Sequence, residues 1–301
     1  MPATAPAKAI RSDIPDPPVI EIQNLSMRFG DHQVLRDISL VLPAGQTLVV
    51  IGESGCGKTV LLKAMNGLLR PTLGEVQFEG MPLARMNEHE LARIRTRYGF
   101  VFQGAALFDS LTIADNIAFP LREHTRLSAA EISDIVESLL GEVGLPQSVA
   151  TMKPMQLSGG MRKRAGLARA LALDPHLILY DEPTTGLDPI MSDVINELIL
   201  RARSRDGVTS VVVTHDMHTA RKVADVILML YPLSRLPPGE PQVIFQGTPH
   251  ELDNCSDPRI RQFIEGQAGT RLSELKDEQA RDQAQATPPT PEHSQHTEDE
   301  T

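Results

Sequence analysis

Residues 52 to 59 contain the sequence feature that most constrains the fold, a glycine-rich run that ends in a lysine and a threonine. Glycines let the backbone turn so that successive N–H groups point at phosphate oxygens, and a helix that starts at the lysine adds its positive end. An apolar run over 47–51 precedes the loop and apolar residues at helical spacing follow it, which favours a strand, a loop and a helix over a chance glycine-rich turn. The predicted phosphate-binding residues are Gly52, Glu53, Ser54, Gly55, Cys56, Gly57, Lys58, Thr59 and Val60.

The end of this loop carries side chains with separate predicted tasks. Lys58 can reach the β- and γ-phosphates of ATP, and the hydroxyl of Thr59 can bind Mg²⁺. Cys56 lies at the start of the predicted helix and close to Lys58. Both features lower the pKa of a thiol, so we expect a reactive thiolate at this position.

Two acidic residues follow a second apolar run. Residues 176–180 read as a buried strand, and Asp181 and Glu182 come directly after it. Ligands of open α/β sheets lie beyond the carboxyl ends of the strands, so Asp181 is predicted to hold Mg²⁺ and Glu182 to act as general base on water. Alone, this pair would also fit an acidic turn, but the phosphate loop upstream favours the catalytic interpretation.

Three more polar residues fit the same site. Gln103 follows the apolar run 98–102 and could sense Mg²⁺ and the attacking water. His215 follows the run 208–214 and could bond the γ-phosphate, while Asp188 lies close enough to the acidic pair for a contact at a subunit seam. The structural alternatives are a strand-end amide, a histidine satisfied within the fold and a helix N-cap, and Asp188 fits both of its roles.

The segment Leu157–Met161 is not expected to contribute to the phosphate-binding site of its own chain. Its residues Ser158, Gly159 and Gly160 fit a lid that one chain supplies to the phosphates bound by another. The sequence therefore predicts a second copy of the chain as partner, with two ATP molecules between the copies.

These motifs resemble the nucleotide-binding ATPase subunits of ABC transporters over about residues 19–250, because five of them match in order and spacing. The resemblance implies an α/β fold: an ABC-type P-loop NTPase with a RecA-like parallel-sheet core, an antiparallel β subdomain and an α-helical subdomain over about 104–170. It also implies ATP and Mg²⁺ as cofactors, Asp181 and Gln103 near the metal, and Ser158, Gly159 and Gly160 as donors to the partner's γ-phosphate.

The resemblance adds one residue to the predicted ATP site, and the sequence differs from the family's pattern at two positions. Phe29 lies where the family stacks an aromatic ring on adenine; the alternative is a hairpin aromatic that packs on the core. Val60 replaces a second hydroxyl after the lysine, which removes one side-chain contact to the α-phosphate. Met161 replaces a glutamine and leaves the three donors of this segment intact.

A narrower resemblance connects residues 103–124, 157–164 and 257–263 to the MlaF-like ATPases, which energise Mce-type lipid transporters. It implies a lipid cargo, with phospholipid favoured, and a role in outer-membrane lipid asymmetry. The implied partners are an MlaE-like integral-membrane permease, an Mce-domain protein and a small STAS-type subunit. ATPases of amino-acid importers share much of the first segment and are the alternative. A soluble ABC ATPase that acts on DNA or ribosomes fits less well, because the chain has one cassette and no heptad repeats.

Composition narrows the class of protein further. The chain has 301 residues, of which 41% are hydrophobic, enough for a large α/β domain and a smaller helical one. A net charge of −10 argues against a nucleic-acid groove. Two cysteines indicate a reducing cytosol, and no apolar run approaches the ~18 residues of a membrane span. These features favour a cytoplasmic protein, and the resemblance implies a peripheral place on the cytoplasmic face of the bacterial inner membrane.

The predicted layout has four parts. Residues 1–18 and the acidic segment 271–301 read as disordered, and 251–270 as a short C-terminal helix region after the ATPase domain, 19–250.

Within the helical subdomain, Ser128 reads as an N-cap and Glu131 completes a capping box. Two sets of residues have less specific predictions. A solvated basic helix face is predicted from Arg162, Lys163, Arg164 and Arg169, the alternative being a site for nucleic acid or a lipid headgroup. A groove for a short helix of the permease is predicted from Ala105, Ala106, Leu107 and Phe108, the alternative being that they pack the insertion onto the core.

Overall fold

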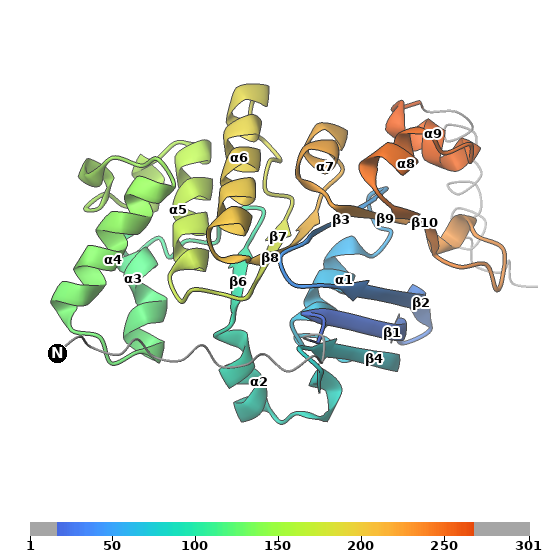
Figure 1. Ribbon diagram of the computed structural model, residues 1–301, viewed down its shortest axis with the longest axis horizontal. Helices are drawn as coiled ribbons and strands as arrows, with labels where there is room; N and C mark the ends of the chain where they lie inside the picture. Colours follow the sequence, from blue (N-terminus) through green and yellow to red (C-terminus); the bar gives the residue numbers. More distant parts are fainter. Residues whose placement is uncertain (1–16, 268–301) are drawn as a thin grey trace, which may run out of the picture. The chain divides into compact units, whose positions relative to one another are not determined.

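The computed structural model describes residues 17–267, apart from the side chains of residues 205 and 206 (Figure 1). The chain divides after Cys255 into two compact units, the second of which contains α9 (Pro258–Ile264). The two predicted disordered segments lie outside the described residues, except for residues 17 and 18. Within the described part, none of the helices combines the length and the apolar character needed to cross a lipid bilayer.

An antiparallel sheet of strand order β2-β1-β4-β5 forms from segments on both sides of the phosphate loop. Its strands are β1 (Ile20–Phe29), β2 (His32–Leu42), β4 (Leu73–Phe78) and β5 (Met81–Pro82). At the start of β1, buried Ile20 and Ile22 alternate with the more exposed Glu21, as expected for a strand with one face on the core. This sheet is the predicted antiparallel β subdomain.

The second sheet has the order β10-β9-β3-β8-β7-β6 and positions the predicted site. Its strands are β3 (Thr47–Gly52), β6 (Tyr98–Val101), β7 (Leu177–Asp181), β8 (Thr209–Val213), β9 (Val226–Leu230) and β10 (Val243–Gly247). Only β10 pairs antiparallel among these strands, so the carboxyl ends of β3, β6, β7 and β8 meet at one edge. The four apolar runs that predicted these strands match them to within one residue at each end.

Helices lie on both faces of this sheet. The α-helices before α9 are α1 (Lys58–Met65), α2 (Glu88–Arg95), α3 (Ile113–His124), α4 (Ala129–Glu142), α5 (Gly159–Leu171), α6 (Pro189–Asp206), α7 (Met217–Val223) and α8 (Pro249–Asp253). α1 lies on one face, and α6 and α7 lie on the other (Figure 1). Burial on both faces explains why residues 48–51 of β3 and residues 211–213 of β8 read as continuous apolar runs rather than as alternating ones.

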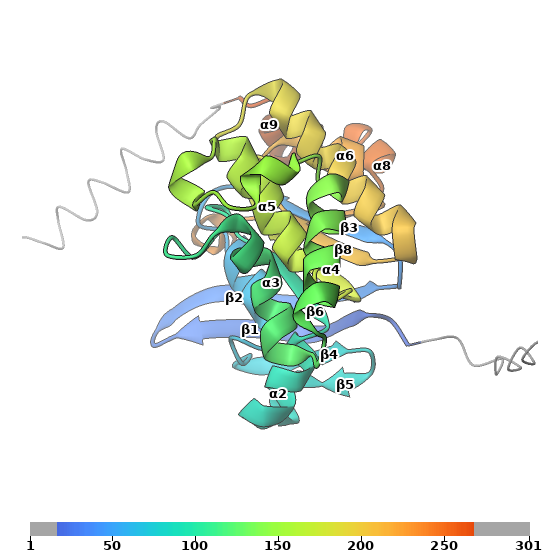
Figure 2. The ribbon, with the colours of Figure 1, turned by 90° about the vertical axis from the view of Figure 1, so that its left-hand side faces the viewer.

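The predicted helical subdomain consists of α3, α4 and α5, which pack on one another (Figure 2). The predicted capping box at the start of α4 is confirmed. The Ser128 hydroxyl accepts a hydrogen bond from the Glu131 N–H at 3.3 Å, and the Ser128 N–H donates to the Glu131 carboxylate at 2.7 Å.

The prediction of a solvated basic face on α5 is wrong. The ammonium of Lys163 is buried and donates to the carbonyls of Pro183 (2.8 Å) and Thr185 (2.7 Å). The same use of cations to bind backbone carbonyls recurs along the helix, from Arg162 to Leu157 (2.7 Å), from Arg164 to Gly144 (2.6 Å) and from Arg169 to Ala106 (2.8 Å). Except for Arg162, these long side chains reach loops that are 20 or more positions away in sequence, so a charge pattern along the helix could not reveal the contacts.

Asn116 of α3 fixes the segment between β6 and α3 from the inside. Its side chain is fully buried, and its Oδ1 accepts from the Phe108 N–H at 2.7 Å. Its Nδ2 donates to the carbonyls of Phe108 (3.1 Å) and Thr112 (2.9 Å). One amide therefore satisfies backbone groups at both ends of the turn that leads into α3.

Replacing this amide should cost stability. Asn116→Leu removes the hydrogen bonds of this side chain without opening a large cavity, so we expect the free energy of unfolding to fall by about 1–3 kcal/mol in urea titrations. Gln147→Leu is the matched control, because that exposed amide donates to the Glu137 carbonyl at 2.8 Å. The control should change stability by less than about 0.5 kcal/mol. Equal losses in both variants would contradict the assigned role of Asn116.

Candidate functional site

A cavity of about 390 Å³ lies at the edge of the sheet where β3, β7 and β8 end. It brings together residues from the phosphate loop, from the acidic pair and from two strand ends, as the sequence predicted. The residues that line it are Val34, Ser54, Gly55, Gly57, Lys58, Thr59, Val60, Gln103, Asp181, Glu182 and His215.

Two glycines of the loop have left-handed or similar backbone conformations and no room for a side chain. At Gly57 φ is 100°, and a Cβ atom would lie 2.6 Å from Cδ2 of Leu35. At Gly52 φ is 145°, and a Cβ atom would lie 2.3 Å from the carbonyl oxygen of Leu230. Neighbouring strands therefore approach the loop as closely as glycine permits, and the backbone itself forms the wall of the cavity.

Lys58 places a positive charge within this loop. Its ammonium donates to the carbonyls of Gly52 (2.7 Å) and Glu53 (2.9 Å), and α1 begins at this residue. N–H groups at the start of a helix and one ammonium are the donors that phosphate oxygens need. The loop thus fits the triphosphate of a nucleotide.

The hydroxyl of Thr59 and the carboxylate of Asp181 both line the cavity and contact each other. Oγ1 of Thr59 donates to Oδ1 of Asp181 at 3.2 Å. Burial raises the pKa of Asp181, and the hydrogen bond from Thr59 opposes that shift only in part. Two oxygen ligands suit Mg²⁺, which keeps several waters and takes further ligands from the phosphates of its substrate. These two residues fit the predicted metal site.

Glu182 is the most constrained of the predicted catalytic residues. Its φ is +50°, and its carboxylate accepts from Oγ1 of Thr185 at 2.9 Å. Nδ1 of His215 lies 2.8 Å from the same carboxylate oxygen. The two contacts aim the carboxylate, and Gln103 lines the same cavity. A carboxylate that is held in this way can orient a water molecule and accept its proton.

The remaining predicted residues lie outside this cavity. Ser158 caps α5 by accepting from the Met161 N–H at 3.3 Å, and a Cβ atom at Gly160 would lie 3.0 Å from the side chain of Met191. Asp188 caps α6 by accepting from the Met191 N–H at 3.0 Å, which confirms its predicted N-cap role. None of these four residues lines the cavity formed by the phosphate loop of the same chain; Ser158, Gly159 and Asp188 are exposed, and Gly160 is buried.

Phe29 ends β1 at the hairpin with β2, where its side chain is 49% exposed. The alternative that this ring packs on the core is therefore wrong. Its exposure leaves the ring available to a planar ligand.

The prediction of a reactive thiolate at Cys56 is wrong. The side chain is 2% exposed, and burial raises the pKa of its thiol more than the nearby charge of Lys58 lowers it. The sequence correctly placed the residue in the loop but could not show that its side chain turns away from the cavity into the core. Desolvation then outweighs the helix terminus and the lysine.

Two residues at the site were not predicted. Thr185 orients Glu182, and Lys163 holds the backbone that carries both of them. The spacing of Thr185, three residues after Glu182, is a signal of a local hydrogen bond that the sequence did offer. No comparable signal exists for Lys163, which comes from another helix.

Comparisons with known proteins agree with this geometry. The family model described as "ABC transporter" matches residues 35–185. The "Intermembrane phospholipid transport system ATP-binding protein MlaF" of Haemophilus influenzae is 41% identical over 250 residues, which cover 83% of this chain and 91% of the relative. The "Probable ribonucleotide transport ATP-binding protein mkl" of Mycobacterium tuberculosis is also 41% identical, over 89% of this chain and 72% of the relative.

A solved structure supports the same assignment. The ATP-binding cassette MJ0796, captured as a dimer in a post-hydrolysis state with ADP and phosphate, has a TM-score of 0.68 and 32% identity to this chain. The match covers 76% of this chain and 98% of that one. The fold, the cavity and these relatives lead to one conclusion: this chain belongs to the ABC transporter family and is an ATP-hydrolysing cassette of that family.

Proposed function

We propose that this chain is the ATPase subunit of a transporter that moves phospholipid between membranes and thereby maintains the lipid asymmetry of an outer membrane. The observation that carries the proposal is the 41% identity to a relative named for intermembrane phospholipid transport, across 91% of that relative. The resemblance over residues 103–124 supports it, because this part of such ATPases meets the membrane subunit.

Two other cargo classes compete with phospholipid. One relative of equal identity is named for ribonucleotide transport, and the chain covers 72% of it. ATPases of amino-acid importers share sequence with the helical subdomain. We favour phospholipid because the match extends over more of the relative that carries this name.

The test is to purify the full chain with its permease from detergent-solubilised membranes. Mass spectrometry of the complex should find bound phospholipid, and phospholipid should stimulate its ATPase activity. A strain that lacks the gene should become sensitive to SDS with EDTA. Stimulation by ribonucleotides or amino acids instead, with an intact barrier in the deletion strain, would overturn the lipid cargo.

The cavity suggests how its residues divide the work. The N–H groups of the phosphate loop and Lys58 bind the phosphates of ATP, and Thr59 with Asp181 would hold Mg²⁺. The ion, when bound, neutralises charge on the phosphates. Glu182 takes a proton from the attacking water, and His215 keeps its carboxylate aimed at that water. Gln103 lies where it can contact the water or the metal.

A second copy of the chain would complete each site. Ser158, Gly159, Gly160 and Asp188 do not line the cavity of their own phosphate loop, and the solved cassette with 32% identity is a dimer. In such a dimer, Ser158, Gly159 and Gly160 would donate to the γ-phosphate held by the partner, and Asp188 would make a contact at the subunit seam. Half-exposed Phe29 would stack on the adenine.

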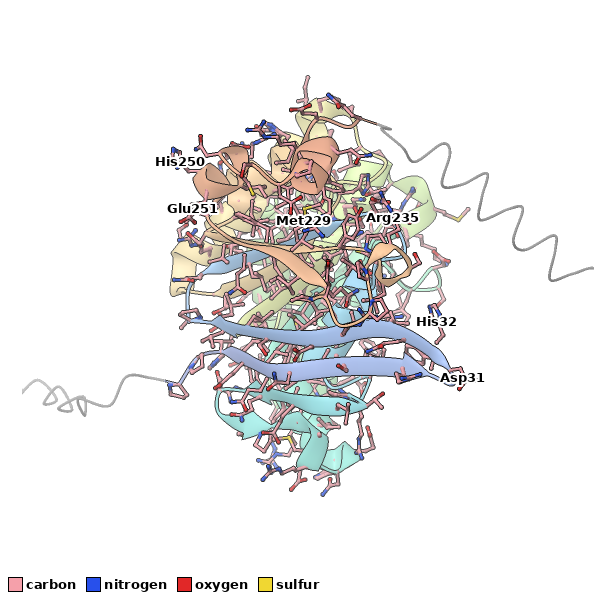
Figure 3. The ribbon with its side chains drawn as sticks, turned by 90° about the vertical axis from the view of Figure 1, so that its right-hand side faces the viewer. Asp31, His32, Met229, Arg235, His250 and Glu251 are labelled. Atoms are coloured by element: carbon pink, nitrogen blue, oxygen red, sulfur yellow. The ribbon has the colours of Figure 1, made fainter. Side chains whose placement is uncertain are left out.

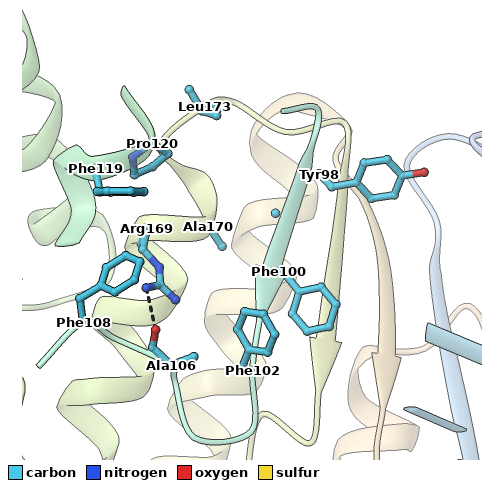
Figure 4. Close-up of a pocket in the computed structure, with 11 residues that line it drawn as sticks. Tyr98, Phe100, Phe102, Ala106, Phe108, Phe119, Pro120, Arg169, Ala170 and Leu173 are labelled. Atoms are coloured by element: carbon cyan, nitrogen blue, oxygen red, sulfur yellow. Dashed lines mark hydrogen bonds between the residues drawn. The ribbon is translucent and has the colours of Figure 1, made fainter. Parts of the chain in front are cut away.

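A groove of about 310 Å³ near Gln103 is our candidate site for the permease (Figure 4). Exposed Phe102, Phe108 and Phe119 line it, and the guanidinium of Arg169 lies 5.8 Å from the ring centre of Phe108. Ala105 is buried against α5 and does not line the groove. For this residue the alternative prediction, packing within the fold, holds. The proposed partners are an MlaE-like permease, an Mce-domain protein and a small STAS-type subunit. The proposed location is the cytoplasmic face of the inner membrane.

Glu182→Gln should stop turnover without stopping ATP binding, because an amide can position water but cannot take its proton. We expect kcat to fall by at least about 100-fold while the Kd for ATP changes little. Glu137→Gln, on the exposed face of α4, is the control and should retain the parent rate. Turnover near the parent rate in the first variant would remove Glu182 as the base.

Maleimide should react with Cys56 much more slowly than with the partly exposed Cys255, because burial both blocks access and raises the thiol pKa. The raised pKa means that little thiolate is present at pH 7–8, so the rate should still rise above pH 9. MgATP should slow the reaction further. Mass spectrometry of labelled peptides measures both sites, and rapid labelling of Cys56 at pH 7 would contradict the burial.

Phe108→Asp should prevent assembly with the permease while the isolated subunit still binds ATP, because it places a carboxylate in the apolar groove. Val41→Asp, at an exposed position of β2, is the control and should assemble normally. Co-purification from membranes measures assembly. Normal recovery of the permease with the Phe108 variant would exclude this groove as the docking site.

A further inference from the structure

The connection between β9 and β10 reaches back to the phosphate loop across more than 180 positions of sequence. It contains the short 3₁₀ helix η4 (Leu233–Arg235), which lies against β2. Figure 3 shows Arg235 on this connection, above the antiparallel sheet. Residues 237–241 of this connection are exposed, whereas Leu236 is buried.

Gln242, where this connection enters β10, has a fully buried side chain whose amide is satisfied on both sides. Its Nε2 donates to the carbonyl of Cys56 at 2.9 Å and to the carbonyl of Val34 at 3.1 Å. Its Oε1 accepts from the Arg36 N–H at 2.9 Å. One amide therefore ties β2 to the phosphate loop.

The bond to Cys56 has a consequence for the next residue. A peptide group is planar and trans, so its C=O and N–H point in opposite directions. Gln242 holds the carbonyl of Cys56 on the side away from the cavity, which directs the N–H of Gly57 to the opposite side. Gly57 lines the cavity, so this N–H faces the place where phosphates bind.

Arg235 holds the other end of the loop. Its guanidinium forms an ion pair with the carboxylate of Glu53 and lies 4.9 Å from the ring centre of Tyr231. Its side chain is mostly buried, which strengthens the pairing relative to an exposed one. The connection thus contacts the loop at its second residue through a side chain and at its fifth through the backbone.

We propose that Gln242 is a positioning residue for the nucleotide: it orients the Gly57 N–H toward the phosphates, and Arg235 assists by fixing Glu53. Glycine at position 57 is required by sterics but is flexible, so the orientation must come from outside the loop. A loop that is already ordered loses less entropy on binding. The proposal depends on ATP binding, which the family shares, and not on the cargo.

The test is Gln242→Met in the full-length chain, a change that keeps the volume and removes the hydrogen bonds. Loss of the bond weakens ground-state and transition-state binding equally, so KM for ATP should rise about 5- to 20-fold while kcat stays within about twofold. The Kd for MgADP, measured by calorimetry, should rise by a similar factor. Gln246→Met, at an exposed position of the same strand, should match the parent protein.

A purely structural role predicts a different pattern. It would lower the melting temperature of the Gln242→Met variant but leave KM and the Kd for MgADP at parent values well below that temperature, and this result would overturn the proposal. A fall in kcat without a rise in KM would overturn it too. If Gln242→Met does not fold, Arg235→Gln decides: the Kd for MgADP should rise about 2- to 5-fold, and binding at parent affinity would refute the proposal.

Discussion

The close approach of two strands to the phosphate loop is the constraint on which the nucleotide site depends. Cβ atoms at Gly52 and Gly57 would collide with β9 and β2, so the loop can follow one path only. That path starts α1 at Lys58 and turns the thiol of Cys56 into the core. β3 pairs with β8 and β9 in the middle of the sheet, and its apolar side chains are buried. This burial fixes the position of β3 and therefore of the phosphate loop that follows it.

Buried or half-buried cations join the helical subdomain to the catalytic edge. Lys163 of α5 binds the carbonyls that follow Glu182, and burial lowers the pKa of its ammonium although the charge of Glu182 opposes this. Arg169 binds the carbonyls of Ala105 and Ala106, two residues with positive φ. Through these two side chains, α5 holds both the backbone that follows Glu182 and the segment after Gln103.

The sequence allowed most of the parallel sheet and most of the site residues to be predicted. Continuous apolar runs bounded by glycines and carboxylates identify buried parallel strands, and their carboxyl ends must meet at one edge. Local hydrogen bonds were equally accessible, as the Ser128–Glu131 capping box and the Asp188 N-cap show. The reactive thiolate and the solvated basic face failed for one reason: both predictions assumed exposure, and burial is decided by contacts from other parts of the chain.

The sequence by itself determined the phosphate loop, the acidic pair and their order, because these depend on residue type and spacing within a few positions. Tertiary structure alone decided the partners of those residues: His215 with Glu182, Lys163 with the backbone beyond Glu182, and Gln242 with the carbonyl of Cys56. Such contacts join segments that are 20 to 186 positions apart. Side-chain periodicity carries no information over such separations, because the path of the intervening chain sets which groups meet.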